Sequence, residues 1–108
     1  MYKPFTKRQT KILLLSLNTL KMHLDTFSTL EEQRQAPSII NATIDFLTIG
    51  TKDNAKALIG ISLASVYAHN ALLGLEKIDD ESLAKMKPFK SEYDSLYKKY
   101  SHILKLNL

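Results

Sequence analysis

The sequence predicts an all-α protein, a single-domain antiparallel four-helix bundle spanning residues 1–108. Three observations support this fold class. Apolar residues recur at intervals of three and four along most of the chain, which is the spacing of one face of an α-helix. Only three glycines and three prolines interrupt the pattern. The chain contains no cysteine, and its 108 residues suffice for one modest hydrophobic core without disulfides.

The first helix is predicted over residues 7–27. Thr6 is a suitable N-cap, because its hydroxyl can accept a hydrogen bond from the backbone of the first turn. Residues 28–36 either extend this helix as a polar tail or form the first connection, and we favour a connection that begins near Thr29 and covers residues 29–36. The apolar residues of the helix would form one line along it, with spacings of four, three, four and three: Leu13, Leu17, Leu20, Leu24 and Phe27.

The second helix is predicted to begin with Pro37 in its first turn and to end at Gly50. Proline suits the first turn because the backbone N–H that it lacks would have no partner there. Glycine readily adopts the left-handed conformation that closes many helices. Asn41 to Thr43 match a glycosylation sequence, which we attribute to chance because it lies within a predicted helix. The core-facing residues are predicted to be Ile39, Ile40, Ile44, Phe46, Leu47 and Ile49.

The third helix, over about residues 53–74, is predicted to be the most buried. The segment from Ala57 to Leu75 carries no charge and is apolar nearly all the way round, so we expect neighbours on two sides. A membrane span is the alternative for such a run, but the polar His69 and Asn70 and the amphipathic flanking segments argue against it. One face carries larger residues: Ile59, Leu63, Val66, Asn70 and Leu73. The other is mostly alanine and permits close helix packing: Ala57, Ile61, Ala64, Ala68, Ala71 and Leu75.

The last helix is predicted to begin after Asp79, a good N-cap, with Asp80 and Glu81 in the first turn where negative charge is favourable. Its apolar line continues in phase through Pro88. Continuous phase indicates one helix kinked near Pro88 rather than two separate helices. A three-helix core with a loosely attached second helix is the alternative architecture. The line consists of Met86, Phe89, Tyr93, Leu96, Tyr100 and Ile103.

Charge is distributed unevenly along the chain, although the formal net charge is only +4. Residues 1–21 contain five basic residues and no acidic one, and residues 85–108 contain six lysines against Glu92 and Asp94. The segment between them holds nine acidic and four basic residues. In an antiparallel bundle the start of the first helix lies beside the end of the last. The sequence therefore predicts a basic surface that both helices share, formed by Lys7, Arg8, Lys11, Lys98 and Lys99.

The sequence contains no recognisable catalytic motif, and we predict that the protein is not an enzyme. Gly-rich phosphate loops, Gly-x-Ser-x-Gly sequences and cysteine nucleophiles are absent. His23, His69 and His102 fall on three different predicted helices without the carboxylates that complete a metal site in a bundle, so we expect no metal and no cofactor. His69 and Asn70 are interpreted as a hydrogen-bonded pair inside the core rather than as a ligand site.

A compact core, a basic surface and no catalytic motif favour a small binding protein that acts through protein–protein contacts. The basic surface would contact the partner, and Tyr97 would serve as an aromatic anchor. A nucleic-acid-binding protein is the alternative, because the same lysines suit phosphates. Peripheral contact with an anionic membrane is a third hypothesis. The remaining interpretation is that the basic surface has no specific partner and only keeps the protein soluble.

In length, basic charge and expected architecture, the chain resembles the small immunity proteins that protect bacteriocin producers. It resembles equally the small phage proteins that block a host factor. The resemblance covers no motif, so no functional residue is carried over from either group. It implies a partner that is itself a protein. The absence of cysteine suits a reducing compartment, and we therefore expect a cytoplasmic protein.

Overall fold

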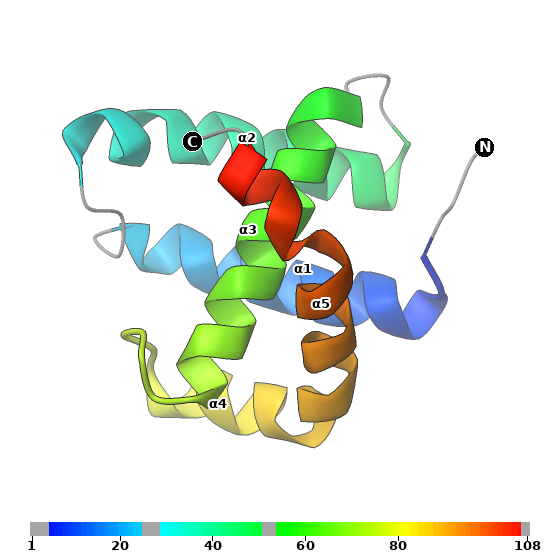
Figure 1. The fold of residues 1–108 in the computed structure, drawn as a ribbon, viewed down its shortest axis with the longest axis vertical. Helices are drawn as coiled ribbons and strands as arrows, with labels where there is room; N and C mark the ends of the chain where they lie inside the picture. The colour runs from blue at the N-terminus through cyan, green and yellow to red at the C-terminus, as the bar shows by residue number, and fades with distance from the viewer. Residues whose placement is uncertain (1–4, 25–28, 51–53, 107–108) are drawn as a thin grey trace.

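The fold is the predicted all-α antiparallel four-helix bundle, with its fourth helix divided into two parts. The structure, a computed structural model, describes residues 5–24, 29–50 and 54–106, and no strand occurs within these ranges. Figure 1 shows that α1 and α2 run in opposite directions, as do α3 and α5, and that the second pair lies across the first. The elements are α1 (Lys7–Met22), α2 (Leu30–Thr48), α3 (Asn54–Leu72), α4 (Asp80–Met86), the 3₁₀-helix η2 (Lys87–Phe89) and α5 (Lys90–Leu106).

Helix α3 is the central element, because it packs against α1, α2, α4 and α5. Its alanine face is buried as predicted, with Ala64 and Ala68 completely inaccessible and Ile61 only 1% exposed. The predicted placement of Leu75 on the same face is wrong, because the helix ends at Leu72 and Leu75 is 71% exposed. Gly74 follows the helix in the left-handed conformation that glycine adopts readily, with φ 78°. The prediction that the third helix is the most buried one is confirmed. Asp53, where the predicted helix begins, lies outside the described residues.

The opposite face of α3, for which a second neighbour is predicted, is partly buried. Ile59, Leu63 and Val66 have intermediate exposure, and Leu63 packs against the hydrophobic core, whereas Leu73 is 53% exposed. No helix in the described part of the chain is long and apolar enough to cross a membrane.

Helix α1 begins as predicted and ends earlier than predicted. Thr6 forms a reciprocal capping box with Gln9, in which each side chain accepts a hydrogen bond of 3.0 Å from the other residue's backbone N–H. The helix ends at Met22, because His23 adopts a non-helical conformation and its side chain bonds to Asp79 of the α4 cap. Phe27, the last residue of the predicted apolar line, lies outside the described residues.

Helix α2 begins two turns earlier than predicted, so the expected connection over residues 29–36 is wrong. Thr29 caps the helix by accepting a hydrogen bond of 3.1 Å from the backbone N–H of Glu32. The acidic first turn also complements the helix dipole. Pro37 therefore lies inside the helix, where it removes the backbone bond to Gln33. At the other end, Gly50 has the expected left-handed conformation, with φ 73°.

The fourth helix is kinked near Pro88, as predicted. Asp79 caps α4 by accepting a hydrogen bond of 2.9 Å from the N–H of Ser82. Met86, Lys87 and Lys90 all keep right-handed helical backbone angles, so the chain changes direction without leaving a helical conformation. The 3₁₀ segment accommodates Pro88, which has no backbone N–H and cannot donate the usual helical hydrogen bond.

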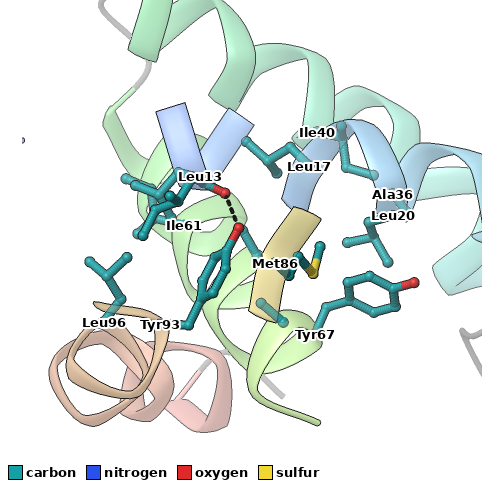
Figure 2. Packing of buried hydrophobic residues seen from close by; sticks show 13 residues of the cluster. Leu13, Leu17, Leu20, Ala36, Ile40, Ile61, Tyr67, Met86, Tyr93 and Leu96 are labelled. Carbon is teal, nitrogen blue, oxygen red and sulfur yellow. Dashed lines mark hydrogen bonds between the residues drawn. The ribbon is translucent and has the colours of Figure 1, made fainter. Parts of the chain in front are cut away.

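Buried hydroxyl groups join the helices at the centre of the core. The Tyr93 hydroxyl of α5 donates a hydrogen bond of 2.7 Å to the carbonyl of Ile12 in α1, and Figure 2 shows its ring among the buried apolar side chains. The Ser16 hydroxyl of α1 donates a bond of 2.7 Å to the carbonyl of Ala64 in α3. Burial raises the pKa of Tyr93, so this hydroxyl remains a donor.

Replacing Ala68 by leucine should destabilise the protein by roughly 1–3 kcal/mol, because the larger side chain overpacks the alanine face of α3. Ala55→Leu, at an exposed position of the same helix, is the matched control and should change stability little. Urea unfolding followed by circular dichroism measures both. Equal stability of the two variants would contradict the close packing of the alanine face.

Replacing Gly60 by alanine should also destabilise the protein by roughly 1–3 kcal/mol. An added Cβ would lie 1.7 Å from the Thr43 hydroxyl oxygen of α2, so the two helices would have to separate. Thr43→Ala removes this oxygen, and the double variant should therefore lose less stability than the sum of the two single changes. Thermal unfolding of all three variants provides the test. Strictly additive losses would rule out this contact.

Candidate functional site

The candidate site is the basic surface of α1 and α5, formed by Lys7, Arg8, Lys11, Lys98 and Lys99. Three contacts hold the start of α1 against α5. The rings of Phe5 and Tyr100 lie 5.7 Å apart, Arg8 pairs with Glu92, and Tyr93 bonds to α1 inside the core. The sequence placed the start of the first helix beside the end of the last. The observed contacts extend further, from Phe89 to Tyr100, because the two helices cross.

Arg8 holds the two helices together. Its guanidinium group lies 2.7 Å from the Glu92 carboxylate and 5.0 Å from the centre of the Phe89 ring. The ion pair is partly exposed, so it contributes modestly to stability, and the ring contact adds a cation–π attraction. Because its charge already faces a carboxylate, Arg8 contributes less than the lysines to the potential that a partner meets.

Lys7, Lys11 and Lys98 are exposed, and within the described residues none of them forms an ion pair. Lys7 and Lys11 are four residues apart on α1, so they lie on the same side of the helix. Lys99 lies 5.4 Å from the centre of the neighbouring Tyr100 ring. The structure therefore presents uncompensated positive charge on two adjacent helices.

Tyr97, the predicted aromatic anchor, lies on the other side of α5. Its ring is half-buried and stacks on His69 of α3, with 3.8 Å between ring centres and 13° between planes. Two residues further along, Lys99 points roughly 200° away around the helix axis. The contacts join α1 to α5 at Arg8 and Glu92, and Tyr97 points away from the side of α5 on which Glu92 and Lys99 lie.

His69 pairs with Asp94 rather than with its neighbour in sequence, Asn70. Its Nδ1 lies 3.1 Å from Asp94 Oδ1, while Lys90 Nζ donates a hydrogen bond of 2.9 Å to Asp94 Oδ2. The hydrogen bond from Lys90 is the main cause that lowers the pKa of Asp94. Sequence analysis missed this cluster, because nothing local relates a histidine to an aspartate on another helix.

A second histidine–aspartate contact joins α1 to α4. His23 Nε2 lies 3.1 Å from Asp79 Oδ1. This hydrogen bond, followed by the one from the Ser82 backbone, lowers the pKa of Asp79 well below its usual value. Within the described residues, no three histidine, aspartate or glutamate side chains are grouped so that they could hold a metal ion.

Comparison with protein-family models, curated protein sequences and solved structures finds no significant match for the chain. The functional argument therefore depends on the residues and their arrangement.

Stability should fall in acid as Asp79 and Asp94 become protonated. Both carboxyl groups have a lower pKa in the folded than in the unfolded state, so the unfolded chain binds more protons. Their contribution is complete above the ordinary aspartate pKa of about 3.9 and is lost as pH falls through the lower folded values. Urea unfolding over this range should show a smaller pH dependence for Asp79→Asn and Asp94→Asn. Asp45→Asn, at an exposed position of α2, is the control, and an equal reduction in all three would contradict the assignment.

Proposed function

We propose that the protein is a non-enzymatic, cytoplasmic binding protein that occupies an acidic surface of another protein. The observation that supports this most directly is the group of exposed lysines without ion-pair partners, Lys7, Lys11 and Lys98, on adjacent helices. Such a surface attracts anionic partners and accelerates their association. Inhibition by occupying a partner's surface is the mode of action of immunity proteins and phage inhibitors, which the chain resembles in format.

A protein partner fits the basic surface better than a nucleic acid does. Glu92 lies within it and neutralises Arg8, which leaves fewer uncompensated cations for the phosphates of a nucleic acid. The mixture of charges therefore favours recognition of a particular protein over general attraction to phosphates.

The proposed function is tested by affinity capture from cells of the source organism, followed by mass spectrometry and a binding measurement with the purified partner. The variant Lys7→Glu/Lys11→Glu/Lys98→Glu should weaken binding by about tenfold or more. The variant Lys21→Glu/Lys77→Glu/Lys85→Glu carries the same net charge and should bind like the parent.

Equal loss in the two variants would show attraction by net charge alone and would contradict a specific basic surface. A gel-shift titration at two salt concentrations tests the nucleic-acid alternative, since release of counterions makes such binding fall steeply with salt. Salt-dependent binding of DNA or RNA, with no protein captured, would overturn the proposed function.

A further inference from the structure

Arg8 lies where α1 meets α5, within the basic surface. The chain contains only two arginines among its 15 basic residues, and this one forms an ion pair between two helices. Lys11 follows Arg8 after three residues on α1, and Lys99 follows Glu92 after seven on α5. At these spacings each lysine lies on the same side of its helix as the nearer member of the ion pair. A partner attracted by the lysines therefore approaches Arg8.

Contacts on two sides hold the guanidinium group of Arg8 in one orientation. Its Nη2 atom lies 2.7 Å from Glu92 Oε1, and its Cζ atom lies 5.0 Å from the centre of the Phe89 ring. Phe89 in turn packs against the hydrophobic core, and the Glu92 side chain is only 30% exposed. Both contacts are thus made to side chains that the fold itself restrains. The guanidinium group is ordered before any partner arrives.

The ordered guanidinium group can still bind a second anion. It carries five N–H donors on three nitrogen atoms, and the ion pair with Glu92 involves one of these nitrogens. The Arg8 side chain is 60% exposed, and no second carboxylate of the described residues contacts it. Two N–H groups of a guanidinium match the two oxygens of a carboxylate, which makes such a contact directional as well as attractive.

The charges at the start of α1 are unfavourable for the helix itself. Positive side chains near a helix N-terminus oppose the helix dipole, and the first turn of α1 contains no acidic residue. Glu92 supplies one carboxylate from α5 against the three cations Lys7, Arg8 and Lys11. Local folding energetics therefore do not account for these cations, whereas recognition of an anion does.

We propose that Arg8 is the specificity-determining contact of the basic surface and binds a carboxylate side chain of the protein partner, while Glu92 and Phe89 are positioning residues that fix its guanidinium group. The inference rests on the proposed function, because it names the chemical group through which the partner is recognised. The lysines attract the partner over a distance, and Arg8 forms the short-range contact that keeps it bound. A carboxylate suits this contact better than a phosphate, because Glu92 repels its single charge less.

Glu92 then has a role opposite to the one that its charge suggests. Removing a carboxylate from a basic surface should strengthen the attraction of an acidic partner. If Glu92 fixes Arg8, its removal instead leaves a flexible side chain that must be ordered on binding, which lowers the affinity by about two- to tenfold. The Glu92→Gln variant therefore decides between a positioning role and a merely opposing charge.

The test measures binding of a hexaglutamate peptide to the full chain at low salt by NMR titration. Arg8→Lys keeps the charge but removes the planar group, and Glu92→Gln leaves that group unfixed, so each should weaken binding about two- to tenfold. Arg34→Lys and Asp45→Asn, at exposed positions of α2, make matched changes of charge and group away from the contact. Both control variants should bind at least as tightly as the parent.

The side-chain signal of Arg8 reports positioning directly. In the parent, its Nε–H signal should show restricted motion in a heteronuclear NOE measurement and should shift when the peptide is added. Glu92→Gln and Phe89→Leu should increase this motion, while circular dichroism shows an unchanged helix content. An Arg8 signal that is equally ordered in the parent and in both variants would exclude the positioning role.

Four binding outcomes would overturn the inference. Tighter binding by Glu92→Gln than by the parent would show that Glu92 only opposes the partner. Equal binding by Arg8→Lys and the parent would show that charge, rather than the guanidinium group, is recognised. Absence of hexaglutamate binding by the parent would exclude a carboxylate. Tighter binding of a peptide with three phosphoserines, which has about the same charge, would assign the contact to a phosphate.

The proposed function is tested separately with the captured partner. If Lys7→Glu/Lys11→Glu/Lys98→Glu loses that partner while Arg8→Lys and Glu92→Gln bind it like the parent, the basic surface functions and this inference fails. If the triple lysine variant also binds the partner like the parent, the proposed function itself is wrong.

Discussion

The close approach of α3 to its neighbours is the constraint on which the rest of the structure depends. Gly60 faces Thr43 of α2 at a distance that excludes a Cβ atom, and Ser16 of α1 bonds to the backbone of Ala64. Small residues at these contacts bring the helix backbones together, so that the larger side chains around them can pack closely in the core. The alanine face of α3 thus determines where α1 and α2 lie, and the remaining helices pack around that unit.

Buried hydrogen bonds determine the geometry of the basic surface. Like charges on α1 and α5 repel one another, so the contact between these helices depends on attractive interactions between other residues. Tyr93 supplies one inside the core, where it is inaccessible to solvent and bonds to α1. A hydroxyl group buried without a partner would destabilise the fold, so this bond favours a single arrangement of the two helices. Arg8 adds a weaker contact at the rim.

Features that depend on local sequence were predictable, and features that depend on contacts between distant residues were not. The three-four spacing located α1, α3 and the kinked last helix, and the caps at Thr6 and Asp79 involve residues three positions apart. The predicted start of α2 is wrong because Pro37, which suits a first turn, lies inside a helix that begins after the cap at Thr29. The end of α1 depends on His23, whose partner is 56 positions away.

The same difference between local features and contacts of distant residues applies to the candidate site. The contact between the start of α1 and α5 was expected from an antiparallel topology, but in the structure the two helices cross, and the side of α5 on which Tyr97 lies depends on its stacking against His69. That contact joins residues on helices separated in sequence by α4. Helical spacing alone shows that Tyr97 and Lys99 point in different directions around the axis of α5. It does not show which of the two side chains faces α1.

The two faces of α3 differ in how far the fold constrains them. The alanine face is buried, and Ser16 of α1 bonds to the backbone carbonyl of Ala64, so only small side chains fit there. On the opposite face Ile59, Leu63 and Val66 are partly buried, and Leu63 packs against the core, whereas Leu73 is 53% exposed. A helix without charged residues over this length is therefore what a central position with neighbours on several sides requires, and the exposed Leu73 lies beyond the end of the helix.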